Sequence, residues 1–104
     1  MTFDPSRLAA CFALTSNAQG KRFLDVSHPI VSARIAFEGA HLLQCTPTGQ
    51  APLLWVSPDD PQLPGKSLRG GIPLCWPWFG GDRSTSAHGI ARRAPWQLSA
   101  AAES

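Results

Sequence analysis

The sequence predicts an all-β fold built from short antiparallel strands. Turn-forming residues are abundant, because the 104 residues include ten Pro and nine Gly that divide the chain into short segments. From Val31 to Glu38, apolar and polar side chains alternate, which is the period-two pattern of a strand with one buried face. Four Trp against a single Met also suit β-structure better than a helical bundle.

A β-hairpin is predicted around the alternating segment. Residues 22–27 form a second strand-like run directly before it, and His28-Pro29 connects the two. The residue before a proline is pushed out of helical conformation, so the connection is expected to be a turn. Residues 22–27 and 31–38 should therefore pair with each other.

Two more strands and a long loop are expected after the hairpin. Gly39 separates the hairpin from a short apolar run over residues 40–45, and the Thr-Pro-Thr-Gly sequence at 46–49 is typical of a turn. Residues 53–56 then predict a fourth strand. The Pro- and Asp-rich residues 57–65 predict an exposed loop that does not separate domains.

Composition limits the chain to one domain or part of one. With 43% hydrophobic and 15% charged residues, 104 residues can bury one modest core. The formal charge of +2 is spread along the chain, so no basic stripe favours nucleic acid. The apolar run at residues 8–14 follows Asp4 and has no clear cleavage site, and it predicts the edge of a folded segment. No run is long enough for a membrane helix, and a cytoplasmic location is expected.

The cysteines favour neither a metal site nor a disulfide framework. Cys11, Cys45 and Cys75 are odd in number and too far apart for a paired-cysteine motif. We expect free, buried thiols in a reducing compartment, and no metal or other cofactor.

One segment, between Lys66 and Leu98, has a different character from the rest. It contains RGGIP at 69–73, CWPWFGG at 75–81 and HGIAR at 88–92. Paired glycines beside a cation let the backbone approach a ligand closely, while Pro and Trp hold a loop in one shape. This density indicates preorganised recognition. The alternative is that Gly and Pro form tight turns and Trp fills a β-core, and composition alone does not decide between the two.

These motifs resemble the signature of the D-hexose-6-phosphate mutarotases, which are aldose-1-epimerase-like sugar phosphate epimerases. RGGIPLCWPWFG, HGIAR and PWQL follow in order, and FEGAHLLQCTPTGQAPLLWVSP upstream is similar to the early strands of that family. The resemblance extends from about Phe23 onward. It implies an antiparallel β-supersandwich of the galactose-mutarotase type, with residues 1–104 as the amino-terminal part of a single domain. It also implies interconversion of the α and β anomers of a hexose 6-phosphate.

The resemblance also implies a substrate-binding site. Arg69 and Arg92 match the family arginines that bind the sugar phosphate, and a guanidinium suits this role because its planar fork meets phosphate oxygens bidentately. The alternative for each is a surface cation or an ion pair with a nearby acid. His88 would hydrogen-bond the sugar. Many family members carry Gln where this chain has Ala87, so only the backbone of Ala87 could contribute.

No catalytic residue is assigned to this chain. Mutarotation requires a base for the anomeric hydroxyl and an acid for the ring oxygen. The resemblance implies a His and a Glu for these steps, in segments beyond Ser104. Three readings therefore stay open: a hexose-6-phosphate epimerase, a non-catalytic sugar-phosphate-binding module, and an inactive fragment whose unpaired strand edges permit self-association.

Overall fold

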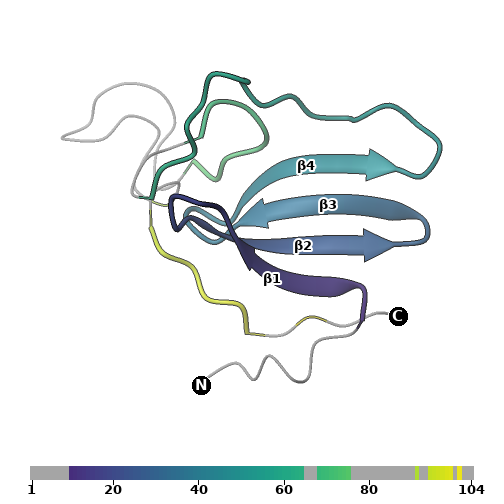
Figure 1. The fold of residues 1–104 in the computed structure, drawn as a ribbon, viewed down its shortest axis with the longest axis horizontal. Coiled ribbons are helices and arrows are strands. Elements are labelled where there is room, and N and C mark those ends of the chain that lie inside the picture. The colour runs from purple at the N-terminus through teal and green to yellow at the C-terminus, as the bar shows by residue number, and fades with distance from the viewer. Residues whose placement is uncertain (1–9, 65–67, 76–90, 92–93, 100, 102–104) are drawn as a thin grey trace.

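The computed structural model describes residues 10–64, 68–75, 91, 94–99 and 101 (Figure 1). These residues form one antiparallel sheet of four strands in the order β1-β2-β3-β4, which confirms the all-β prediction. The strands are β1 (Phe12–Ser16), β2 (Arg22–His28), β3 (Val31–Ala36) and β4 (His41–Pro47). No helix in the described part of the chain is long and apolar enough to cross a membrane.

The predicted hairpin is confirmed. β2 pairs with β3 from Phe23↔Ala36 to His28↔Val31, and the turn between them contains Pro29. The β1–β2 connection is held by Asn17, whose Oδ1 accepts hydrogen bonds from the backbone N–H groups of Gln19 and Lys21. The sequence did not predict β1, because its first three residues belong to the uniformly apolar run at residues 8–14, which shows no period-two alternation.

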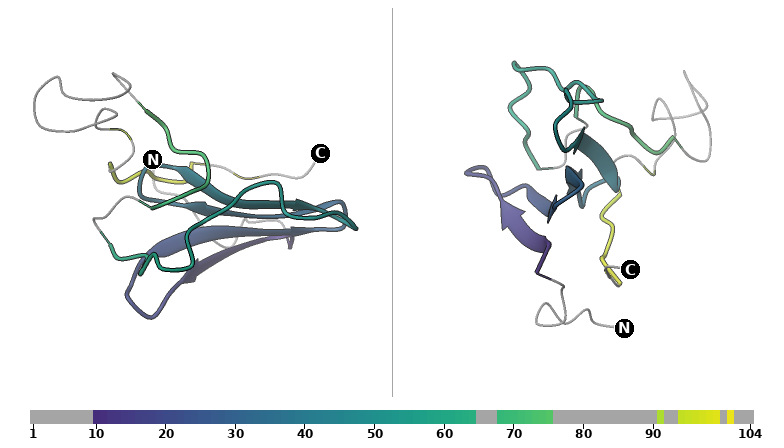
Figure 2. Two further views of the ribbon diagram at one scale, coloured as in Figure 1. Left: turned by 90° about the horizontal axis from the view of Figure 1, so that it is seen from above. Right: turned by 90° about the vertical axis from the view of Figure 1, so that its right-hand side faces the viewer.

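The prediction of a strand at residues 53–56 is wrong. After β4 the chain turns at Gly49 and runs back beside the sheet (Figures 1 and 2). Leu53 donates one hydrogen bond to Cys45 at 2.9 Å, and Val56 forms an isolated bridge with Gly70. Proline stands on both sides of this segment, at 52 and 58. Because proline has no N–H to donate, a continuous ladder is interrupted at both positions.

The two faces of the sheet are covered by different segments. On one face, Phe23, Ala36 and Leu43 are buried together with Leu68, and Val56 packs against them. On the other, residues 96–98 lie against Leu24 and Ile35 around a small apolar hollow of about 140 Å³. The register shift at Arg34/Ile35 leaves Leu43 as the extra residue of a β-bulge. A bulge increases the local twist of a sheet, and the residue next to it, Leu42, pairs with Ile72 of the RGGIP motif.

Candidate functional site

The RGGIP motif forms a turn held between β4 and the segment that follows it. On one side, Ser57 donates a hydrogen bond to the carbonyl of Arg69 at 2.7 Å, and Gly71 donates to the carbonyl of Trp55 at 2.8 Å. On the other side, Leu42 and Ile72 exchange two backbone hydrogen bonds, at 2.8 and 3.3 Å. The backbone around Arg69 is therefore fixed from both directions.

Both glycines of this turn are required by its geometry. Gly70 has φ +123° and Gly71 has φ +68°, which are conformations that residues with a Cβ rarely adopt. A Cβ on Gly70 would collide with the carbonyl oxygen of Trp55, and one on Gly71 with that of Leu42. The paired glycines were expected to let the backbone approach a ligand closely. In the structure they let the turn approach the protein's own backbone, at Trp55 and Leu42.

His41, at the start of β4, holds the same turn through its side chain. Its side chain is buried, at 2% exposure, and Nε2 lies 2.6 Å from the carbonyl oxygen of Gly70. Because a carbonyl only accepts hydrogen bonds, His41 donates through Nε2. This contact gives His41 a structural role in holding the turn. Its partner lies 29 residues away in the chain, so no local pattern pointed to the turn.

Asp60 contacts the turn from the loop at 57–64. Its Oδ2 accepts a hydrogen bond from the backbone N–H of Arg69 at 2.6 Å, and Oδ1 accepts one from Gln62 at 2.8 Å. These residues form a loop, as predicted. No pattern in the sequence indicates that this loop contacts the RGGIP motif.

The loop is itself tied to the sheet. Asn17 Nδ2 donates to the carbonyl of Gln62 at 3.0 Å, and Lys21 Nζ donates to that of Leu63 at 3.3 Å. Lys21 is 1% exposed and also forms an ion pair with Glu38 at 3.5 Å. A chain of polar contacts thus runs from the β1–β2 connection, through the loop, to the backbone of Arg69.

The predicted site residues are described only in part. Arg69 is exposed, and within the described part of the chain no acidic side chain forms an ion pair with its guanidinium. Ala87, His88 and Arg92 lie outside the described residues, so their roles stay predictions. Ala91, next to Arg92, is buried, and its carbonyl accepts a hydrogen bond from Trp96 Nε1 at 3.1 Å. This contact links the end of HGIAR to the PWQL sequence.

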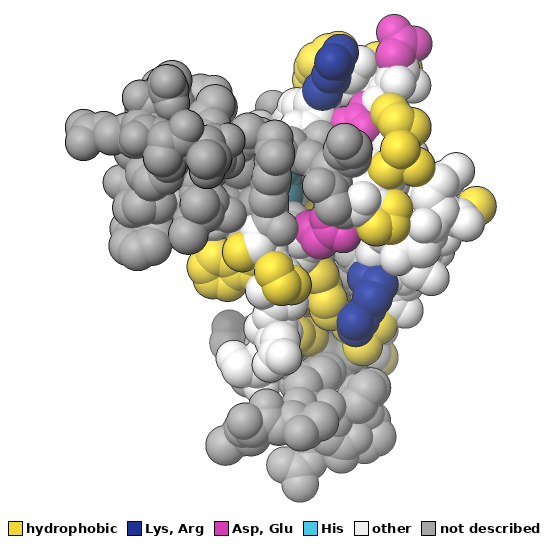
Figure 3. All heavy atoms as spheres, turned by 90° about the vertical axis from the view of Figure 1, so that its left-hand side faces the viewer, with side chains coloured by type: hydrophobic (Ala, Val, Ile, Leu, Met, Phe, Trp, Pro, Cys, Tyr) yellow, Lys and Arg dark blue, Asp and Glu magenta, His cyan; other side chains and the backbone are white. Residues whose placement is uncertain are grey.

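Charged side chains of both signs lie on one face of the described part of the molecule. On the face drawn in Figure 3, basic and acidic side chains among the described residues lie apart and are interspersed with apolar ones. A phosphate site on this face would therefore depend on individual cations held in place, because Figure 3 shows no broad patch of basic side chains among the described residues there.

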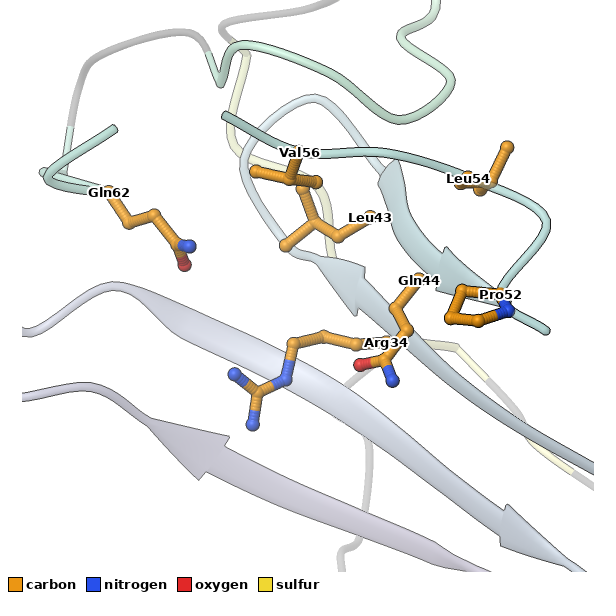
Figure 4. Close-up of a pocket in the computed structure, with 7 residues that line it drawn as sticks. All are labelled: Arg34, Leu43, Gln44, Pro52, Leu54, Val56 and Gln62. Atoms are coloured by element: carbon orange, nitrogen blue, oxygen red, sulfur yellow. The ribbon is translucent and has the colours of Figure 1, made fainter. Parts of the chain in front are cut away.

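A groove of about 260 Å³ lies between the sheet and the segment after β4 (Figure 4). Its basic residue, Arg34, is already engaged: Nε and Nη2 donate to the two carboxylate oxygens of Asp25 at 2.7 and 3.0 Å. The guanidinium also lies 4.6 Å from the ring centroid of Phe23. The hydrogen bond from Arg34 lowers the pKa of Asp25, against the opposing effect of burial. Because this cation is neutralised, the groove suits an anion less well than the turn at Arg69. The groove is lined by Arg34, Leu43, Gln44, Pro52, Leu54, Val56 and Gln62.

The cysteines and acidic residues of the described chain suggest no metal centre. Among the described residues, Cys11, Cys45 and Cys75 form no disulfide, and each is half-buried where full burial was expected. Among the residues that the structure describes, no group of three or more His, Cys, Asp or Glu could hold a metal ion.

The sheet and its covering segment define an all-β protein of the galactose-mutarotase type. A crystal structure titled "putative mutarotase (YeaD)", from Salmonella typhimurium, is 40% identical, with a TM-score of 0.82 over 90% of this chain and 32% of that one. A second crystal structure, of HI1317, is 36% identical, with a TM-score of 0.86 over 93% of this chain and 36% of that one. The predicted β-supersandwich fold is thereby confirmed.

A model of the family described as aldose 1-epimerase matches residues 22–103. The chain belongs to the aldose 1-epimerase family, as the RGGIP and HGIAR motifs predicted. A relative from Salmonella typhimurium named "Putative glucose-6-phosphate 1-epimerase" is 48% identical over 77 residues, which are 72% of this chain and 26% of that protein. A relative of the same name from Escherichia coli is 48% identical over 75 residues, which are 70% of this chain and 26% of that protein. The chain thus spans about a quarter of the length of these relatives.

Proposed function

We propose that this chain forms the substrate-phosphate-binding part of a hexose-6-phosphate epimerase, which interconverts the α and β anomers of a sugar such as glucose 6-phosphate. The names of the relatives support the substrate class. The observation that carries the proposal is the turn at Arg69, which holds an exposed guanidinium on a backbone fixed by hydrogen bonds on both sides. A cation held in this way binds an anion at a lower cost in conformational entropy than a cation on a mobile loop does.

Each residue of the proposed site has a distinct part in the reaction. Arg69 and Arg92 bind the phosphate, His88 hydrogen-bonds the sugar, and Ala87 contributes only its backbone. Binding at the phosphate end positions C1 without taking part in proton transfer. The reaction itself needs a base that deprotonates the anomeric hydroxyl and an acid that protonates the ring oxygen, so that the ring opens, C1 rotates and the ring recloses. We assign neither group to this chain, and the reaction needs no metal or nucleotide.

Exchange between the anomers of glucose 6-phosphate, followed by NMR, tests the proposal. The exchange is measured with the 104 residues alone and with the same residues joined to the remaining part of the Salmonella relative. The joined protein should accelerate exchange over buffer, and Arg69→Ala should reduce that acceleration. If the joined protein gives the buffer rate, the epimerase proposal is wrong.

A second candidate function is a non-catalytic sugar-phosphate-binding module. It is favoured by the finding that the turn at Arg69 is complete within a chain spanning 26% of its relatives' length. This reading predicts saturable binding of hexose phosphate by the 104 residues without anomer exchange. Arg69→Ala or Arg92→Ala should weaken phosphate-bearing ligands far more than neutral sugars, and equal loss for both would exclude phosphate contact. We also propose that the chain is cytoplasmic and that it self-associates through unpaired strand edges.

A further inference from the structure

We infer that Asp60 is a positioning residue for Arg69, and that its carboxylate sets the strength of phosphate binding without touching the ligand. This inference rests on the proposed role of Arg69. It starts from the unusual arrangement in which one carboxylate joins two separate segments. Oδ1 accepts from the N–H of Gln62 in its own loop, and Oδ2 accepts from the N–H of Arg69, nine residues on.

The bond to Arg69 has the geometry of a strong contact. At 2.6 Å it is at the short end for an N–H donor and a charged acceptor, and such bonds are about twice as strong as neutral ones. It acts on the backbone N–H of Arg69 while Ser57 donates to the carbonyl of the same residue at 2.7 Å. Both polar groups of the Arg69 backbone are therefore fixed, and the direction in which its side chain leaves the turn is fixed with them.

The carboxylate is held in place by a strained backbone. Gln62 has φ +52°, a left-handed conformation that costs a residue with a Cβ about 1 kcal/mol. Two hydrogen bonds maintain it: Asp60 Oδ1 accepts from its N–H, and Asn17 Nδ2 donates to its carbonyl at 3.0 Å. Strain that is kept by specific contacts points to a function for the conformation. In this conformation the Gln62 N–H reaches Asp60 Oδ1 while Oδ2 of the same carboxylate accepts from the Arg69 N–H.

A purely electrostatic effect of Asp60 would change the affinity for the phosphate ligand in the opposite direction. The direction of the measured change therefore tests the inference. A carboxylate near a phosphate site repels the ligand, so removing its charge should strengthen binding. If Asp60 instead positions Arg69, removing it should weaken binding. Asp59 is the matched control, because it is an exposed acid in the same loop, and among the described residues its carboxylate forms no hydrogen bond or ion pair with Arg69.

The experiment compares Asp60→Ala, Asp60→Asn, Asp59→Ala and Arg69→Ala. Affinities for glucose 6-phosphate and for glucose are measured by NMR titration with the 104-residue chain and with the joined protein described above. Asp60→Ala should weaken glucose 6-phosphate about tenfold, as expected for losing one charge-assisted hydrogen bond, with little effect on glucose. Asp60→Asn retains one acceptor oxygen and should fall between Asp60→Ala and the unchanged protein. Asp59→Ala should leave the affinity equal or slightly higher.

A second readout separates positioning from simple loss of charge. Hydrogen exchange of the Arg69 amide should accelerate in Asp60→Ala and stay unchanged in Asp59→Ala. If Arg69→Ala weakens glucose 6-phosphate while Asp60→Ala and Asp59→Ala behave alike, the positioning role is wrong and the proposed function stands. If the unchanged protein does not bind glucose 6-phosphate, or Arg69→Ala has no effect, the proposed function fails and this inference fails with it.

Discussion

At the scale of single residues, two glycines with different surroundings allow a direct test of the turn at Arg69. Gly49 and Gly70 both have positive φ, at +78° and +123°. A Cβ on Gly49 would meet nothing within 4 Å, whereas one on Gly70 would overlap the backbone of Trp55. Gly49→Ala therefore measures conformational strain alone, about 1–2 kcal/mol. Gly70→Ala adds a collision with atoms that cannot rotate away.

We predict that Gly70→Ala lowers the free energy of unfolding by about 2 kcal/mol more than Gly49→Ala does. Urea denaturation of the two variants measures the difference. Equal losses would mean that the backbone around Trp55 yields easily, and the turn would then be less rigid than its hydrogen bonds indicate.

The ion pair between Asp25 and Arg34 should make the stability of the fold depend on pH. Its pKa is lowered below the ordinary value of 3.8, first by the hydrogen bond from Arg34. A carboxylate with a lowered folded-state pKa binds fewer protons than the unfolded chain does, so its contribution is present above pH 3.8 and is lost as pH falls through the lower folded value. Because Arg34 is 39% exposed, the contribution should be about 1 kcal/mol or less.

Unfolding of Asp25→Asn and Arg34→Gln by urea, at about pH 7 and about pH 3, measures this contribution. Both variants should lose less stability on acidification than the unchanged chain. Asp59→Asn, which removes an exposed carboxylate outside the sheet, should follow the unchanged chain. An unaltered pH response in Asp25→Asn would contradict the assigned ion pair.

At the scale of elements, Lys21 connects β2 to the loop that carries Asp60. Its ammonium is 1% exposed and bonds to the carbonyl of Leu63 and to Glu38. Lys21→Met keeps the apolar stem but removes the donor, so the carbonyl of Leu63 and the partly buried carboxylate of Glu38 each lose a hydrogen bond from the ammonium. We predict a loss of about 1–3 kcal/mol in the free energy of unfolding, measured by urea denaturation.

The adjacent Arg22→Met is the control for Lys21→Met. Arg22 is exposed, and its guanidinium lies 4.9 Å from the ring centroid of Phe37. A cation–π contact at such a site contributes about 0.5–1 kcal/mol. If Lys21→Met costs no more than Arg22→Met, the buried ammonium is not an anchor for the loop.

Comparison of elements shows what the sequence could and could not predict. The β2–β3 hairpin was predictable because regular alternation and Pro29 act locally. The fourth strand, at residues 53–56, was predicted wrongly because strand pairing depends on partners that composition does not reveal. In the same way, RGGIP identified Arg69 and its glycines, but Asp60 and His41 contact this turn across nine and 29 residues. Contacts at such separations come from the fold and leave no periodic signal in the sequence.

At the scale of the whole molecule, the described residues form a sheet whose first strand has a free outer edge. β1 pairs only with β2, and Ser27 donates to the carbonyl of Cys11 at 2.7 Å. In an antiparallel ladder hydrogen-bonded pairs alternate, so the N–H groups of Phe12 and Leu14 face outward. Large apolar side chains are also exposed, including Ile30 at 70% and Trp55 at 66%. Both features favour association, because an open edge is a template for another strand.

We predict that the 104-residue chain self-associates through β1, and that a lysine on this edge prevents it. Ala13→Lys places a charge at an exposed position of β1, whereas Ala51→Lys adds the same charge at an exposed position away from the edge. Sedimentation velocity over a range of concentrations should show association in the unchanged chain and in Ala51→Lys, and a monomer in Ala13→Lys. Because pairing would bury the outward N–H groups, amide exchange at Phe12 and Leu14 should slow with concentration only in the associating proteins. Equal association in both variants would contradict pairing through β1. It would indicate that the exposed apolar side chains make the contact, since neither lysine changes them.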